Sequence, residues 1–99
     1  MSQSSTHCVG PRFRLGRIFA TPAAVDVMNA ARVSIVDLLI LHVRGDWGAL
    51  SEFDRQQNEL STEARLRLLS SYALPNGQTV WVITEGDRSA TTFLLPGDY

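Results

Sequence analysis

The sequence predicts a single α+β domain, with one N-terminal strand, two to three short helices and then a three-stranded antiparallel meander. Two observations support this. Helix-start signals are confined to the region between residues 21 and 62, and from residue 68 onward the apolar residues recur with a period of two. A chain of 99 residues is the size of one domain. We expect the helices to pack on one face of the sheet, because so few helical residues cannot cover both faces.

A first strand is predicted over residues 13–20, after an N-terminal tail formed by residues 1–11. In this stretch apolar residues alternate with Arg12 and Arg14, which we expect to face water. Gly16 interrupts the alternation and indicates a bulge.

The first predicted helix begins with Thr21 as its N-cap and Pro22 at its first helical position. Its apolar residues fall on one face. These residues are Ala24, Val27, Met28 and Ala31.

A second helix is predicted over residues 35–44, where Ser34 and Asp37 resemble a capping box and Gly45 ends the helix. Its residues are apolar nearly all round, which is typical of a buried helix.

Ser51 and Asp54 predict a third helix over residues 52–59, and Ser61-Thr62 is expected to start a further short turn. The meander strands are predicted over residues 68–74, 78–84 and 90–95. Pro75-Asn76-Gly77 suits the hairpin loop between the first two of them.

The two apolar faces of the meander differ in the size of their side chains. We expect the set with larger groups to pack on the helices; it contains Trp81, Ile83, Phe93 and Leu95. The smaller set then faces outward, so Val80, Val82 and Leu94 are predicted to line an exposed interface with another chain or a second copy. The alternative is an ordinary solvent face rich in Val and Thr.

Composition argues against several classes of function. The formal net charge of −1 and the pI of about 6.0 disfavour broad nucleic-acid binding, although Arg12, Arg14 and Arg17 leave room for a local basic edge. No apolar run approaches the ~20 residues of a membrane span. Cys8 is the single cysteine and cannot form a disulfide framework, so we expect a cytoplasmic protein.

Few polar residues have a spacing that suggests chemistry, and the sequence predicts no metal site and no cofactor. His42 is interpreted as a packed or capping residue, and Asp54 and Asn58 as structural. The most specific polar cluster is the turn between the last two strands. We interpret it as a candidate recognition tip; it comprises Glu85, Asp87 and Arg88, with Asp46 and Trp47 nearby.

Three segments carry a resemblance to a known group. They read "HVRGDWG" from His42, Asn58-Glu59, and "SSYALPNGQTVWVITEGDRSATTFLLPGDY" from Ser70 to the end. The chain resembles a family of small bacterial proteins from plasmids and other mobile elements over residues 12–99. The resemblance implies no established reaction. Where this chain has Gly86 the family commonly has Ala, which argues against a glycine-dependent ligand loop.

The leading expectation is therefore a protein-interaction or accessory module rather than an enzyme, with an anti-defence or plasmid-maintenance role as its context. Two alternatives remain. One is a ribonuclease toxin, by analogy of element order; the residues able to contribute are Tyr72, Arg65, Arg67 and Arg88. The other is a small-molecule or metal site, built on Glu85, Asp87, Asp46 and His42.

Overall fold

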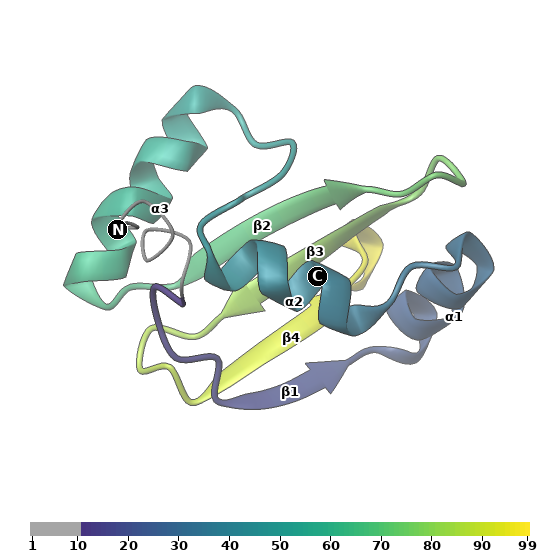
Figure 1. Ribbon diagram of the computed structural model, residues 1–99, viewed down its shortest axis with the longest axis horizontal. Coiled ribbons are helices and arrows are strands. Elements are labelled where there is room, and N and C mark those ends of the chain that lie inside the picture. Colours follow the sequence, from purple (N-terminus) through teal and green to yellow (C-terminus); the bar gives the residue numbers. More distant parts are fainter. Residues whose placement is uncertain (1–10) are drawn as a thin grey trace, which may run out of the picture.

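The computed structural model describes residues 11–99, apart from the side chain of residue 63. The predicted tail and Cys8 therefore lie outside the described residues, except for Pro11. The element order is β1 (Arg17–Ala20), α1 (Pro22–Ala31), α2 (Ile35–Val43), α3 (Glu52–Ala64), β2 (Leu68–Ala73), β3 (Thr79–Thr84), β4 (Ala90–Leu94) and a short 3-10 turn, η2 (Pro96–Asp98). This order confirms the α+β class (Figure 1).

The four strands form one mixed sheet in the order β1-β4-β3-β2. The three C-terminal strands are antiparallel as predicted, while β1 joins the sheet parallel to β4, with Phe19 beside Thr92. A parallel neighbour requires a crossover, and the three helices supply it. As a result, β1 and β2 are the two edges of the sheet.

Helices α1 and α2 lie over one face of the sheet (Figure 1). Thr21 caps α1, since its hydroxyl accepts a hydrogen bond of 3.1 Å from the Ala24 amide. Ser34 caps α2 through the Val36 amide. The core between the helices and the sheet is apolar and consists of Ala24, Met28, Leu38, Tyr72, Leu74, Val80, Val82 and Phe93.

Helix α2 is buried on one side only, which corrects the expectation of a fully buried helix. Leu38 and His42 are buried, whereas Val36 and Ile40 on the outer side are 59% and 41% exposed. Its second apolar stripe is therefore not covered by the described residues.

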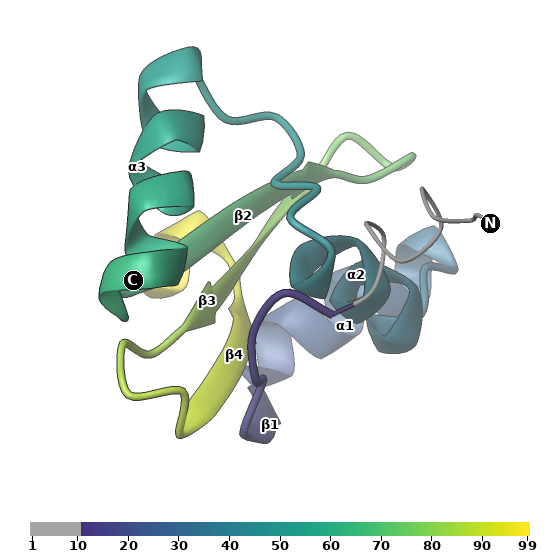
Figure 2. The same cartoon turned by 60° about the vertical axis from the view of Figure 1, so that its left-hand side comes forward.

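Helix α3 begins at the predicted cap, where Ser51 accepts a hydrogen bond from Asp54 N, but it continues past residue 59 to Ala64. The polar pair Ser61-Thr62 does not start a new turn, because the Thr62 hydroxyl donates to the Asn58 carbonyl within the helix. The helix stands beside β2 and away from α1 and α2 (Figure 2).

The predicted packing of β3 and β4 is wrong in its register. Trp81 pairs with Leu94 and Val82 pairs with Phe93, so the two sets of side chains are combined differently from the prediction. Val80, Val82 and Phe93 face the helices. Val80 and Val82 are both 0% exposed and cannot line an exposed interface.

The opposite face carries Trp81, Ile83 and Leu94. It is not bare. The C-terminal residues fold back across it, since the ring of Tyr99 meets that of Trp81 edge-on at 5.9 Å and its hydroxyl accepts a 2.6 Å hydrogen bond from Arg67. Consequently Ile83 and Leu94 are only 6% and 7% exposed.

Candidate functional site

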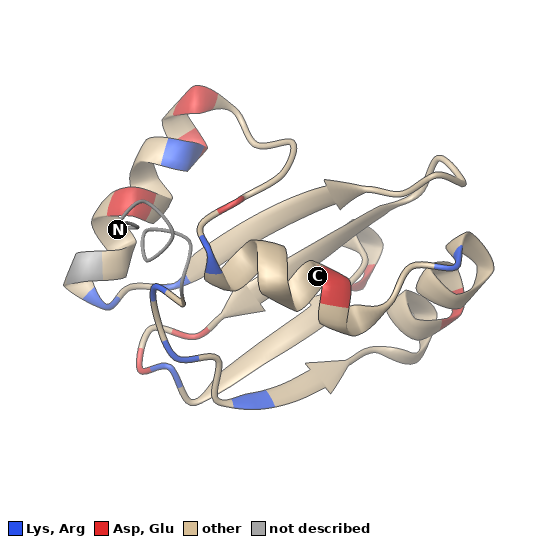
Figure 3. Ribbon diagram, viewed as in Figure 1, with Lys and Arg blue, Asp and Glu red and all other residues tan. Residues whose placement is uncertain are grey.

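Charged residues gather at one end of the molecule, where the N-terminal segment, the β3–β4 turn and the end of α3 meet (Figure 3). The N-terminal segment, residues 11–16, runs across this end before it enters β1. Two hydrogen bonds hold the backbone of this segment, from the Arg12 amide to the Val43 carbonyl at 2.8 Å and from the Thr91 hydroxyl to the Leu15 carbonyl at 2.7 Å.

Phe13 is the centre of an aromatic cluster at this end. Its ring lies 5.2 Å from that of His42, edge-on, and 6.1 Å from that of Trp47, nearly parallel. The guanidinium carbon of Arg88 lies 5.6 Å from the centroid of the same ring, a cation–π distance. Phe13 therefore connects three elements far apart in sequence.

Arg12 and Glu59 tie the N-terminal segment to α3. Two guanidinium nitrogens of Arg12 donate to the Glu59 carboxylate at 2.6 and 3.0 Å, and the Trp47 indole N–H donates to the same carboxylate at 3.0 Å. The Arg12 hydrogen bond is the main reason that the pKa of Glu59 is lowered. Arg12 is exposed as expected, and at the surface it pairs with Glu59.

His42 is fully buried within a network of hydroxyl groups. Its Nδ1 lies 2.6 Å from Ser70 Oγ and its Nε2 lies 2.9 Å from Thr84 Oγ1, which in turn lies 2.7 Å from Thr91 Oγ1. Burial, followed by the nearby charge of Arg88, lowers the pKa of His42 to about 3. The imidazole is therefore neutral, and its interpretation as a packed residue is confirmed.

Arg88 points inward and has a structural role. Its guanidinium donates to the carbonyls of Ser61, Leu66, Glu85 and Gly86 at 2.8 to 3.2 Å, which ties the end of α3 to the β3–β4 turn. Only 7% of its surface is exposed. None of these hydrogen bonds joins Arg88 to the carboxylate of Asp87.

Asp87, by contrast, is exposed. Its carboxylate accepts a hydrogen bond of 2.9 Å from the Ser89 amide. Hydrogen bonding to the side chain of Ser89, followed by that to its amide, lowers the pKa of Asp87. Glu85 forms an exposed ion pair of 3.3 Å with Arg67. Of the turn residues predicted as a recognition tip, Asp87 and Glu85 therefore have charged groups that solvent can reach, and Glu85 is engaged by Arg67.

The other predicted members of the tip lie on the far side of Phe13. Trp47 is 1% exposed and acts as a core residue. Asp46 is exposed, its carboxylate accepts from the Gly48 amide at 3.4 Å, and its carbonyl accepts the hydroxyl of buried Tyr72 at 2.5 Å. Because Trp47 and Arg88 are enclosed, the five residues do not form one accessible epitope.

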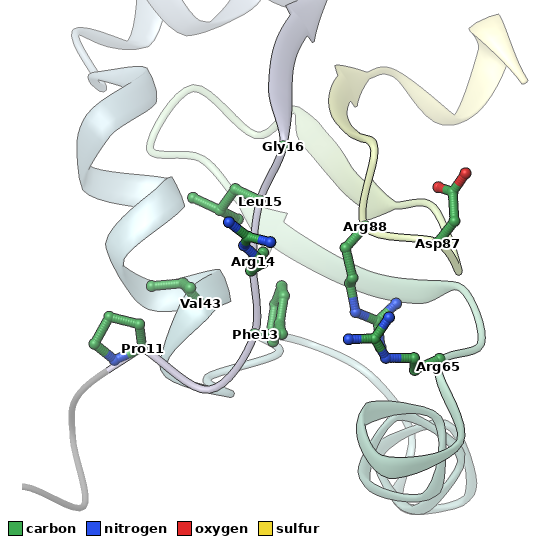
Figure 4. A pocket seen from close by; sticks show the side chains of 9 residues that line it. All are labelled: Pro11, Phe13, Arg14, Leu15, Gly16, Val43, Arg65, Asp87 and Arg88. Carbon is green, nitrogen blue, oxygen red and sulfur yellow. The ribbon is translucent and has the colours of Figure 1, made fainter.

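A pocket of about 560 Å³ opens between the N-terminal segment and the β3–β4 turn (Figure 4). Its walls combine apolar side chains with three arginines and one carboxylate. The lining residues include Phe13, Leu15, Val43, Arg14, Arg65, Asp87 and Arg88. Of these, the sequence analysis named Asp87 and Arg88 in the recognition tip, and Arg65 and Arg88 in the ribonuclease alternative.

Sequence reasoning placed Phe13 and Arg14 in no site and named Arg65 only for the ribonuclease alternative, because the partners of these residues come from distant segments. The available signal was the group formed by Arg12, Arg14 and Arg17, which indicated a local basic edge. That edge exists, but each arginine in it has a different environment: one pairs with Glu59, one lines the pocket and one lies on β1.

Within residues 11–99, no helix combines the length and apolar character that a membrane crossing requires. No three or more His, Cys, Asp or Glu side chains of the described part lie close enough together to hold a metal ion. His42 in particular is enclosed by its hydroxyl partners and does not join Glu85 and Asp87.

Comparison with known proteins adds no relative: no family model, no curated protein and no solved structure matches this chain. The resemblance to plasmid and mobile-element proteins stays a prediction.

Proposed function

We propose that this chain is a small cytoplasmic protein-interaction module that binds an extended segment of a partner protein along the edge of β1. The observation that carries the proposal is the hydrogen bonding of that strand. The amides of Arg17 and Thr21 donate to carbonyls of Ser89 and Phe93 on the β4 side. Residues alternate in direction along a parallel pair, so the backbone groups of Ile18 and Ala20 point away from the sheet.

The side chains beside this edge suit a protein partner. Ile18 and Phe19 lie on opposite faces of β1 and are 41% and 48% exposed. An edge strand with unpaired backbone groups and apolar side chains is a template for an added strand. Arg17 lies at the start of the strand and favours a partner segment with an acidic residue.

The other edge of the sheet is closed. At β2, the Asn58 side chain donates to the Leu69 carbonyl at 2.6 Å and accepts from its amide at 3.2 Å. Ser71 is paired in the same way with the backbone of Trp47 and Ala49, at 3.0 and 2.7 Å. Within residues 11–99 one edge of the sheet is protected and the other is open, which supports a specific docking strand rather than unselective sheet pairing.

The biological context of the module follows from the resemblance alone. An accessory protein of a plasmid or other mobile element, with an anti-defence or maintenance role, agrees with a small binding module. The ribonuclease alternative has less support, because His42 and Tyr72, the groups nearest in type to its acids and bases, are buried and hydrogen-bonded.

Selection of binding peptides from a random library tests the proposal. We expect enriched peptides to bind the wild-type chain, and to lose binding to Ile18→Pro, because proline removes the outward N–H and is tolerated on an edge strand. Ile18→Ala is the matched control, since it shortens the same side chain but keeps the N–H. The Ala variant should retain most of the peptide affinity.

Equal peptide affinity for the Ala and Pro variants would reject strand addition at this edge. Sedimentation velocity separates a further outcome: a dimer that dissociates in Ile18→Pro would identify the added strand as that of a second copy. Tryptophan fluorescence of each variant checks that the buried Trp47 keeps its environment.

A further inference from the structure

We propose that the pocket between the N-terminal segment and the β3–β4 turn binds a phosphate monoester in its dianionic form. The pocket is separate from the β1 edge, so this site is independent of the proposed protein-binding function. Its three arginines come from three parts of the chain that only the fold brings together: Arg14 precedes β1, Arg65 ends α3 and Arg88 lies in the β3–β4 turn. Figure 4 shows their side chains around the opening.

The charge of the lining is unbalanced. Three guanidiniums and the single carboxylate of Asp87 give it a net charge of +2. The ion pairs formed among the described residues, Arg12–Glu59 and Arg67–Glu85, lie outside this lining. A phosphate monoester carries about −1.5 to −2 charges at neutral pH, which matches this excess.

Arg88 is the strongest indication that an anion belongs here. It is a cation with 7% exposure, and its hydrogen bonds to the described part of the chain all go to neutral carbonyl groups, with none from its Nε. A buried charge without an opposite charge is costly. The guanidinium of Arg65 lies close enough to add repulsion, which together with burial lowers the pKa of Arg88.

The size and the apolar wall indicate more than an inorganic ion. A volume of about 560 Å³ is within the usual range of small-molecule sites. Phe13, Leu15 and Val43 form one side of the pocket and would contact the carbon body of the ligand, while the arginines bind the phosphate. Guanidinium groups suit phosphate oxygens because they donate two parallel hydrogen bonds.

Phenyl phosphate is a suitable probe, titrated at constant ionic strength and followed by amide NMR shifts and calorimetry. We expect saturable binding, with shifts in the N-terminal segment and the β3–β4 turn. Arg65→Gln should weaken it about five- to tenfold, the effect of one charge-assisted hydrogen bond. Asp87→Asn should tighten binding about two- to threefold, because it removes a like charge and keeps the turn contact to Ser89.

Arg32→Gln is a closely matched control. Arg32 and Arg65 both end helices in the left-handed conformation with φ of 58°, and both are exposed, but Arg32 is absent from the pocket lining. The Arg32 variant should bind phenyl phosphate as the wild type does. Both variants should have similar melting temperatures, so a difference in affinity reports the pocket.

The arms of the titration distinguish the ligand classes. Inorganic phosphate binding as tightly as phenyl phosphate would support the arginine site but limit the ligand to the phosphate group itself. Phenol binding as well as phenyl phosphate would overturn the proposal. So would equal affinities of the Arg65 and Arg32 variants, or the absence of saturation at millimolar concentrations.

Discussion

His42 shows at the scale of one residue how the fold sets a proton equilibrium. A neutral imidazole has one donor and one acceptor nitrogen, and the hydroxyls of Ser70 and Thr84 satisfy both. An imidazolium would have to desolvate its charge here, which is why burial lowers the pKa of His42 to about 3 from its ordinary value of 6.5. In the unfolded chain the ring binds a proton near its ordinary pKa.

Stability should therefore fall in acid before the carboxylates titrate. The contribution of neutral His42 to stability is complete above the unfolded pKa of 6.5, and it is lost as the pH falls from 6.5 toward 3. Between pH 7 and pH 5 we expect a loss of about 2 kcal/mol in the free energy of unfolding. His42→Gln should be less stable at pH 7 but should lose much less over this interval.

Urea unfolding of both proteins at several pH values measures the slope. His7 is present in both chains, so its contribution cancels in the comparison. Lowered carboxylate pKa values affect stability mainly below the ordinary pKa of the group, which is 4.5 for Glu59. Parallel pH profiles of the two proteins would disprove the assignment to His42.

Arg88 supports a second prediction at the residue scale. Its planar guanidinium reaches carbonyls of the α3 end and of the β3–β4 turn at once, and a lysine ammonium cannot span them. We expect Arg88→Lys to lower the free energy of unfolding by about 2–4 kcal/mol. Arg14→Lys, in the same pocket but exposed, should change it by no more than about 0.5 kcal/mol.

Chemical denaturation of the two lysine variants gives this comparison directly. If Arg88→Lys unfolds at the same denaturant concentration as the wild type, the four carbonyl contacts contribute little to stability. The structural role assigned to this side chain would then be wrong.

At the scale of elements, the connection into β1 depends on one close approach. Gly16 has φ of 67°, and a β-carbon there would lie 2.4 Å from the backbone of Ser89. Gly77, in the β2–β3 hairpin, also has a positive φ, 83°, but nothing lies within 4 Å of such a carbon. The two positions therefore separate backbone strain from steric conflict.

Alanine at each position measures that difference by thermal or urea unfolding. Gly77→Ala should cost about 1–2 kcal/mol, the strain of a left-handed residue. Gly16→Ala should cost at least about 1–3 kcal/mol more, because the β4 end must also move. Equal losses of unfolding free energy at the two positions would show that the N-terminal segment can move away from Ser89 with little loss of stability.

The elements themselves could be predicted because their signals are local. The caps at Thr21, Ser34 and Ser51 each act within three residues, and the bounds of β2, β3 and β4 agree with the periodic pattern to within one residue. The first strand is shorter than predicted, since it begins at Arg17 and not at residue 13. The register between β3 and β4, by contrast, does not follow from a local signal. It depends on how many residues the turn from Glu85 to Ser89 contributes, and a shift of one residue changes which side chains of the two strands share a face. Val80 and Val82 were placed outside for another reason, because their side chains are smaller than those of Trp81 and Ile83.

The candidate site was predictable only in part, for a related reason. The turn around Asp87 and Arg88 is recognisable from its residue types, and it does line the pocket. Its partners are not: Arg88 meets Phe13 from the start of the chain and Ser61 from α3. These contacts join residues that lie far apart in the sequence, and no local sequence pattern predicts them. The pocket can therefore be recognised only in the tertiary structure.

At the scale of the whole molecule, the two edges of the sheet should differ in hydrogen exchange. The amides of Leu69 and Ser71 at the β2 edge donate to Asn58 and Trp47. Those of Ile18 and Ala20 point away from the sheet at the β1 edge. We expect exchange of the β1 pair to be faster by at least about tenfold, since a protecting hydrogen bond must open before exchange.

Amide exchange followed by NMR tests this asymmetry, and Asn58→Leu serves as its internal control. The variant should speed exchange at Leu69, which loses its acceptor, but affect Ser71 less, because Trp47 still accepts from it. Slow exchange at Ile18 and Ala20 in the wild type would mean that β1 already has a neighbour in solution. Dilution then decides whether that neighbour is a second copy, since only protection by self-association declines with protein concentration.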